Sequence, residues 1–130
     1  MKTELNKKNN QTTVVIDVSY VVENKIARDF IKDEHATVFY NLKDDGILRF
    51  EWYLNEDDKT GTLIEVFDNS QVWEEVGNKL IGSPVNLRLR ELFTIEKITV
   101  LGDISDEFKE KLKQMSSPVI KTYMGGIRQE

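Results

Sequence analysis

FEWYLNEDDKTGTLIEVF, residues 50–67, is the stretch that decides the fold, because it reads as two strands joined by a polar turn. Successive side chains of a strand point to opposite faces of its sheet. In the first strand, one predicted face carries Leu48, Phe50, Trp52 and Leu54, and the other carries Ile47, Arg49, Glu51 and Tyr53. The turn is longer than the tight two-residue type, so it leaves open which face of the second strand carries Glu65.

Strands and helices alternate on both sides of this hairpin. Residues 13–22 are rich in β-branched side chains and predict a strand, and residues 24–43 predict an amphipathic helix that ends at Asp45-Gly46. After the hairpin, the sequence predicts a helix starting near residues 68–70, a short helix opened by Ser83-Pro84, a strand at 93–102, a helix opened by Ser105 and a last extended piece. This order is typical of an α+β, ferredoxin-like βαββαβ domain with an appended C-terminal helix and strand.

Size and charge limit the function. The chain of 130 residues has a net charge of −5 and no cysteine. We expect one domain at residues 13–130 after a flexible, polar tail at residues 1–12, with no signal peptide and therefore a cytoplasmic location. A nucleic-acid partner is not expected, because phosphate binding needs concentrated positive charge. A membrane partner is not expected either, since no apolar run approaches the roughly 18 residues of a membrane helix.

The predicted topology leaves one face of the sheet bare. The right-handed crossover rule puts both main helices on the same face. The other face would then expose Val15, Val21, Ile47 and Tyr53 as an apolar patch. A second copy of the chain is the simplest cover, so we predict a homodimer whose sheets face one another.

The block DDGILRFEWYLNEDDKTGTLIEVFDNSQVWEEV, residues 44–76, resembles the centre of the antibiotic-biosynthesis-monooxygenase-like dimeric α/β barrels. In that superfamily a glycine-initiated strand with an acidic turn is followed by a strand and a helix. The tail VLGDISDEFKEKLKQMSSPVIKTYMGGI is similar to an extension in an uncharacterised subgroup. The resemblance covers residues 13–127.

The resemblance implies a ferredoxin-like protomer, a dimer whose sheets form a barrel, and a pocket between sheet and helices in each subunit. Its oxygenases use no metal, flavin or haem, and their substrates are electron-rich phenols that react with oxygen once deprotonated. We therefore expect no cofactor. The haem-degrading branch fits less well, because its iron-binding histidine, shortly after the second helix, has no counterpart in GNKLIGSPVNLRL.

His35 is the only histidine, and it shares the predicted inner stripe of the first helix with Ala27, Ile31, Val38 and Leu42. One imidazole cannot supply a multi-ligand metal site, so we expect no bound metal. As a general base, His35 would accept a phenolic proton at neutral pH. The plainer alternative is a histidine at the edge of the core, hydrogen-bonded to the backbone.

Several aromatic side chains could hold a flat substrate beside His35. The candidates are Phe39, Phe50, Trp52, Trp73 and, from the appended strand, Tyr123. Aromatic residues at inward positions are more often simple core, which is the alternative here.

On the opposite face, Arg49, Glu51 and Tyr53 are predicted interface residues, together with Glu65 if the hairpin register allows it. A charge-paired interface would satisfy these groups, because unpaired burial is costly. The resemblance thus implies a small-molecule pocket protein of the monooxygenase-like class, for which a cofactor-free oxygenase of a phenol or quinol is a candidate activity. A family member without an assigned reaction is favoured over any named reaction. The alternative is a non-catalytic dimeric binding or stress-response protein.

Overall fold

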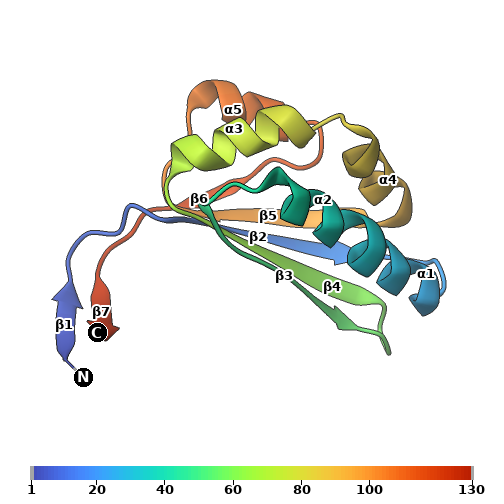
Figure 1. Cartoon of the computed structure of the whole chain (residues 1–130), viewed down its shortest axis with the longest axis horizontal. Helices are drawn as coiled ribbons and strands as arrows, with labels where there is room; N and C mark the ends of the chain where they lie inside the picture. The colour runs from blue at the N-terminus through green and yellow to red at the C-terminus, as the bar shows by residue number, and fades with distance from the viewer. Residues whose placement is uncertain (1, 130) are drawn as a thin grey trace.

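The computed structural model describes residues 2–129 as one five-stranded sheet with helices on one face (Figure 1). The order of strands across the sheet is β3-β4-β2-β5-β6. Its strands are β2 (Thr12–Ser19), β3 (Ile47–Asn55), β4 (Thr60–Phe67), β5 (Thr94–Leu101) and β6 (Val119–Lys121). All pairings are antiparallel except the parallel pair β5–β6. The α+β, ferredoxin-like prediction is confirmed.

The central strand β2 anchors the core. Its residues alternate strictly between buried and half-buried positions, so Val14, Ile16 and Val18 face the helices. Leu63 and Phe67 on β4 and Ile98 and Val100 on β5 continue this buried surface. The alternation of residues along β2 predicted correctly which side chains face the helices, because a strand with one solvated face must turn its apolar side chains to the other face.

The first helical region runs from Asn24 to Leu42, as predicted, but it is not a regular α-helix throughout. It consists of α1 (Asn24–Asp29), the π-helical η1 (Phe30–His35) and α2 (Ala36–Leu42), and Lys43 ends it with a left-handed φ of 52°. In η1, the Ala36 N–H bonds to the carbonyl of Ile31, five residues earlier. This wider turn buries both Phe30 and His35, whose rings lie 5.4 Å apart between centroids.

Three further helices cover the same face: α3 (Ser70–Leu80), α4 (Pro84–Leu92) and α5 (Asp106–Leu112). The Asn69 side chain accepts a hydrogen bond from the Val72 N–H at the start of α3, and Ser105 does the same for Phe108 in α5. The Phe108 ring lies so close to Gly77 in α3 that a side chain there would collide with it. Glycine at this position lets α5 seat on α3.

A β-bulge changes the predicted faces at the start of β3. Its register with β4 shifts between Ile47, which pairs with Phe67, and Arg49, which pairs with Val66. Leu48 is the extra residue and is 43% exposed, whereas Ile47 packs against the core. The expectation that Ile47 lies on the open face is therefore wrong, because the bulge inserts one residue and inverts the alternation locally.

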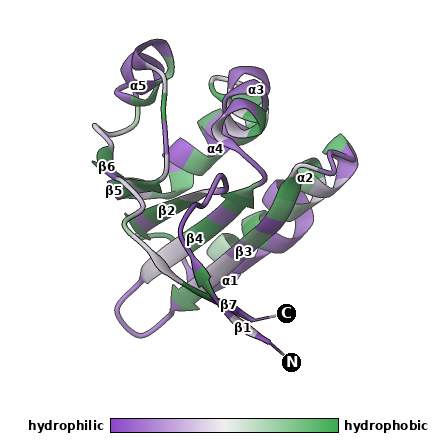
Figure 2. Cartoon of the chain, turned by 90° about the vertical axis from the view of Figure 1, so that its left-hand side faces the viewer, coloured by the Kyte–Doolittle hydropathy of each residue, from purple (hydrophilic) through white to green (hydrophobic). Residues whose placement is uncertain are grey.

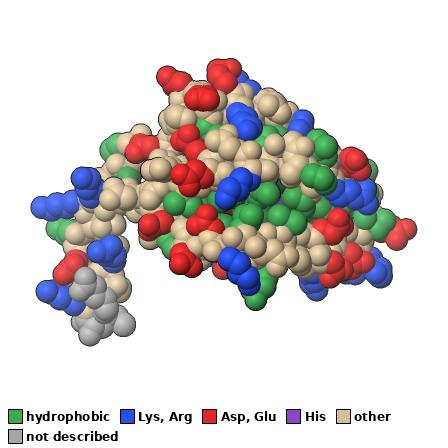
Figure 3. Space-filling model, turned by 45° about the horizontal axis from the view of Figure 1, so that its top comes forward, with side chains coloured by type: hydrophobic (Ala, Val, Ile, Leu, Met, Phe, Trp, Pro, Cys, Tyr) green, Lys and Arg blue, Asp and Glu red, His purple; other side chains and the backbone are tan. Residues whose placement is uncertain are grey.

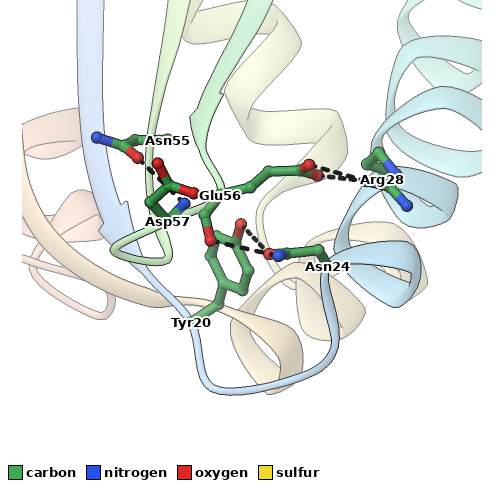
Figure 4. A network of polar contacts seen from close by, with 6 residues as sticks. All are labelled: Tyr20, Asn24, Arg28, Asn55, Glu56 and Asp57. Atoms are coloured by element: carbon green, nitrogen blue, oxygen red, sulfur yellow. Dashed lines mark hydrogen bonds and ion pairs between the residues drawn. The ribbon is translucent and has the colours of Figure 1, made fainter.

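The acidic turn between β3 and β4 is tied to α1 (Figure 4). Glu56 receives two hydrogen bonds from the Arg28 guanidinium, at 2.7 and 2.9 Å. Asn24 accepts a hydrogen bond from the Tyr20 hydroxyl at 2.7 Å and donates one to the Glu56 carbonyl at 3.2 Å. These contacts fix this end of the sheet to the helix layer.

The chain ends pair with each other instead of forming a loose tail. β1 (Thr3–Asn6) runs antiparallel to β7 (Gly126–Gln129). This two-stranded ribbon extends away from the helices, beyond the open face of the sheet (Figures 1 and 2). Within the tail predicted at residues 1–12, Thr3–Asn6 form a strand that the sequence did not predict, since the partner strand lies more than a hundred residues away in sequence. Among the described residues, no helix has the length and apolar character needed to cross a membrane.

Candidate functional site

His35 lies where the sequence predicted it, in the layer between the helices and the sheet. It is buried at the end of η1, with only 5% of its surface exposed. The indole N–H of Trp52, on β3, donates a hydrogen bond to its Nδ1 atom at 3.0 Å. The predicted pair therefore comes together, since alternation along β3 turns Trp52 toward the helices.

This hydrogen bond decides the protonation of His35. An indole N–H only donates, so Nδ1 must be unprotonated, and the proton of the neutral ring sits on Nε2. Burial lowers the pKa of His35 to about 4, so the ring is neutral at pH 7. The imidazole offers an N–H donor at Nε2 instead of a basic nitrogen. This arrangement does not favour the predicted role of general base.

The rings around His35 form an aromatic cluster. Phe39 and Phe50 stack on each other with their centroids 4.1 Å apart, and both meet the imidazole edge-on. Trp52 packs in turn on Phe93 at 5.2 Å. Such contacts restrict the imidazole to one orientation. The predicted pocket residues Phe39, Phe50 and Trp52 therefore hold His35 in place.

Glu65 lies on the helix-covered face and not beside Glu51. In the hairpin Glu65 pairs with Phe50, whereas Glu51 pairs with Ile64, so the two carboxyl groups point to opposite sides of the sheet. Glu65 is only 8% exposed. Glu65 therefore does not share the predicted interface with Glu51, because the hairpin register turns its side chain to the helix-covered face.

The Glu65 carboxyl group has no partner within residues 2–129: none of their side chains or backbone groups forms a hydrogen bond or ion pair with it. Burial raises its pKa to about 8, because desolvation disfavours the charged form. A carboxyl group whose pKa lies near neutrality can both take up and release a proton under ordinary conditions. Perturbed groups of this kind gather at functional sites.

Glu65 and His35 line the same cavity, which has a volume of about 70 Å³. Its walls come from β2, β4, the first helical region, α3, α4 and the segment after α5. The other lining residues are Val14, Ile16, Phe39, Trp73, Val76, Gly77, Leu80, Ile81, Val85, Asn86 and Met115. Two titratable groups thus face a mostly apolar space, which is the composition expected of a ligand site.

Of the two remaining predicted pocket residues, Trp73 lines the cavity and Tyr123 lies near the chain ends. Trp73 forms part of the cavity wall, where it packs edge-on against Phe108 at 4.8 Å. Tyr123 is not a cavity residue: its hydroxyl donates to the Asn6 carbonyl at 2.5 Å beside the terminal ribbon. Tyr123 therefore lies outside the cavity that contains His35, because the segment that carries it leads to the terminal ribbon and not over the helices.

On the open face, the predicted interface residues Arg49, Glu51 and Tyr53 are joined by hydrogen bonds. Arg49 donates to Glu51 at 2.5 Å, and the Tyr53 hydroxyl donates to the same carboxylate at 3.2 Å. The hydrogen bond from Arg49 is the main cause that holds the pKa of Glu51 below its usual value. These side chains are solvent-accessible and far from the cavity face.

Sequence reasoning missed Glu65, Asn86 and Met115 as cavity residues. For Glu65 a signal existed: it stands between Leu63 and Phe67 at a spacing of two, and both are large apolar residues. Ile64 and Val66 are equally apolar, however, so alternation favoured neither face. Asn86 accepts a hydrogen bond from the Gly82 N–H and donates one to Met115, contacts that join α4 to the distant C-terminal segment.

Comparison with known proteins supports the fold. No family model matches the chain, and no curated protein sequence does. MupZ from Pseudomonas fluorescens has a similar structure, with a TM-score of 0.67 at 16% identity over 88% of this chain and 91% of that one. SnoaB from Streptomyces nogalater, a cofactor-independent oxygenase, has a TM-score of 0.53 at 16% identity over 74% and 95%.

The chain shares the fold of a cofactor-independent oxygenase. At these identities the likeness concerns the arrangement of the backbone, which agrees with the monooxygenase-like resemblance of residues 44–76. The chemistry of the site must be argued from its own residues.

Proposed function

We propose that this protein is a cofactor-independent oxygenase of a phenol or quinol, and that Glu65 is its general base. The observation that carries the proposal is the Glu65 carboxyl group, which lies buried beside His35 in one cavity and has no partner among residues 2–129. The oxygenase fold of SnoaB supports the reaction class. The structure suggests this assignment over His35 as base, because His35 is neutral and has its proton on Nε2.

The two residues divide the work. The ionised Glu65 takes the hydroxyl proton of the substrate, and the His35 Nε2–H donates a hydrogen bond to the phenolate oxygen that forms. The deprotonated ring delivers electrons to molecular oxygen, and a ring carbon forms a bond to one oxygen atom. Cleavage of the peroxide bond releases the other as water, with a proton returned from Glu65. A hydroquinone and oxygen thus give a hydroxyquinone and water, and the substrate supplies all four electrons.

Oxygen uptake with a panel of hydroquinones tests this proposal. Glu65→Gln keeps the shape of the side chain but removes its basicity, so we expect a loss of about 10²-fold or more. Glu51→Gln, at the other glutamate of the hairpin, is the matched control and should retain the parent rate. The parent rate should rise with pH through about 8, as Glu65 ionises. No uptake above background for the parent across the panel would rule out this reaction.

A second candidate is a binding protein without catalysis, and the small volume of the cavity favours it. In that case phenols would bind, as measured by equilibrium dialysis, and oxygen uptake would stay at background for parent and Glu65→Gln alike.

We also propose that the protein is a homodimer in which a second copy covers the open face. The chain exposes 8086 Å², whereas a monomer of 15.1 kDa is expected to expose about 7,100 Å². The protruding terminal ribbon contributes to this excess together with the open face, where a standard interface would bury roughly 800 Å² of each partner. Tyr53 is 55% exposed on this face, within the cluster that includes Arg49 and Glu51.

A further inference from the structure

The cavity is too small to enclose an aromatic ring. Its volume of about 70 Å³ is roughly half that of an engineered cavity of about 150 Å³ that binds benzene. If the protein acts on a phenol, only the hydroxyl end of the molecule can reach Glu65 and His35. The body of the substrate must then lie in a neighbouring space.

A groove of about 480 Å³ adjoins the cavity. One wall consists of Asp33, Glu34, Thr37 and Val38, from η1 and α2, and the other of Leu80, Ser83, Pro84 and Val85, from the end of α3 and the start of α4. Leu80 and Val85 line both the groove and the cavity, so they separate the two spaces. In the space-filling view, hydrophobic side chains gather in the hollow between the helices (Figure 3).

The groove has a selective chemical character. Its floor is apolar, and Asp33 and Glu34 stand exposed on one wall with no lysine or arginine among the described lining residues. The hydroxyl oxygen of Ser83 is buried and has no hydrogen-bond partner in the described chain. An apolar body with at most one polar substituent would satisfy these walls, whereas an anionic body would be repelled by the two carboxylates.

We propose that this groove is the subsite for the body of the substrate, a neutral phenol with an apolar body, whose hydroxyl end passes between Leu80 and Val85 toward Glu65. The inference rests on the proposed function for the identity of the reacting group. It adds the class of substrate, because the groove accepts a neutral aromatic body and rejects an anionic one. Neither Leu80 nor Val85 is fully buried, so both have room to separate as the hydroxyl end enters.

Equilibrium dialysis with two matched probes tests the subsite. 1-Naphthol is neutral, and 5-hydroxy-1-naphthoate carries a carboxylate on the ring farther from its hydroxyl group. We expect the parent to bind 1-naphthol at least tenfold more tightly. In the double variant Asp33→Asn/Glu34→Gln, the ratio of the affinities for 1-naphthol and 5-hydroxy-1-naphthoate should be several-fold smaller than in the parent. Equal affinity of the parent for both probes, or no binding of 1-naphthol, would overturn the proposal.

A groove-filling variant locates the bound probe. Thr37→Trp places an indole in the groove without touching the cavity wall, and it should weaken 1-naphthol binding by tenfold or more. Leu87→Trp, at a 49% exposed position of α4 outside the groove, is the matched control and should bind as the parent does. Circular dichroism confirms that both variants are folded. Unchanged affinity in folded Thr37→Trp would contradict the subsite.

The outcome separates the subsite from the proposed reaction. Dialysis measures binding without chemistry, so it reports on the groove even where no oxygen is consumed. Probe binding that Thr37→Trp abolishes, together with no oxygen uptake by the parent, would support the subsite and reject the oxygenase. Oxygen uptake that is lost in Glu65→Gln but unchanged in Thr37→Trp would support the oxygenase and reject the subsite.

Discussion

The two glutamates of one hairpin show how far the faces of the sheet differ. Glu51 lies on the open face, is held by Arg49 and Tyr53, and has a lowered pKa. Glu65 lies on the helix-covered face, has no partner among the described residues, and has a pKa raised to about 8. The residue type is the same and the strands are neighbours. Desolvation and pairing, which depend on side-chain direction, therefore decide which carboxylate can exchange a proton at neutral pH.

The largest expected effect concerns the stability of Glu65→Gln. The folded pKa of Glu65 lies above its unfolded value of 4.5, so its contribution to stability is fully present below pH 4.5 and is lost as the pH rises to about 8. The loss in the free energy of unfolding is about 5 kcal/mol at most. Urea unfolding of Glu65→Gln between pH 6.5 and 8.5 should lack this decline.

Glu51→Gln is the control for that comparison. Its side chain is accessible and paired on the surface, so the variant should retain the alkaline decline of the parent. A decline that persists in Glu65→Gln and vanishes in Glu51→Gln would reverse the assignment of the two faces.

A somewhat smaller effect is expected for His35→Gln, with the opposite pH dependence. The folded pKa of about 4 lies below the unfolded 6.5, so the unfolded chain binds the proton first and stability falls as the pH drops from 6.5 to 4. This loss is about 3 kcal/mol at most. It overlaps with the Glu65 effect between pH 4.5 and 6.5, where the two slopes oppose each other.

The His35 effect is therefore measured in a Glu65→Gln background. Urea unfolding of Glu65→Gln should show a clear acid decline, and the double variant Glu65→Gln/His35→Gln should lose it. An unchanged acid decline in the double variant would mean that His35 is not the group responsible.

Trp52→Phe tests the role of the hydrogen bond to His35. It should lower the free energy of unfolding by about 1 kcal/mol, the usual contribution of one hydrogen bond. The variant removes the only donor to Nδ1 among residues 2–129, so the pKa of His35 should rise and the proton should distribute over both ring nitrogens. Nitrogen NMR of the imidazole measures both. Trp73→Phe, which changes the cavity wall but no hydrogen bond of His35, should leave the tautomer unchanged.

The smallest effect on folding is expected at the open face. Tyr53→Glu removes an exposed ring and adds a second carboxylate beside Glu51, so it should weaken a dimer formed through this face by about tenfold or more. Light scattering over a concentration series measures the change, and Leu48→Glu, at the bulge, is the control. A parent that is monomeric at micromolar concentration would refute the dimer itself.

Local patterns predicted much of the fold. Asn69, Ser83-Pro84 and Ser105 mark helix starts where the structure has them, because capping depends on residues within one turn. The direction of Trp52 and the inward position of His35 followed from spacing alone. Their mutual hydrogen bond did not, since it joins a helix to a strand and depends on how the two pack.

The features that the sequence left open or predicted otherwise have physical causes in common. The bulge at Leu48, the direction of Glu65 and the pairing of Thr3–Asn6 with β7 each depend on a partner strand that local spacing does not contain. The wide turn at Phe30–His35 departs from the regular helical spacing that the prediction assumed. One inserted residue in a strand or a helical turn rotates its neighbours to a different face.

The sequence by itself determined the order of strands and helices from β2 to α5, the helix caps and the single histidine facing the interior, because periodicity and capping are local. Only the tertiary structure decided that Glu65 is buried with no partner in the described part of the chain and that His35 is a neutral donor. The pKa of an ionisable group depends on its desolvation and its neighbours in space, and both arise only when the hairpin, the π-helical turn and α3 and α4 pack together.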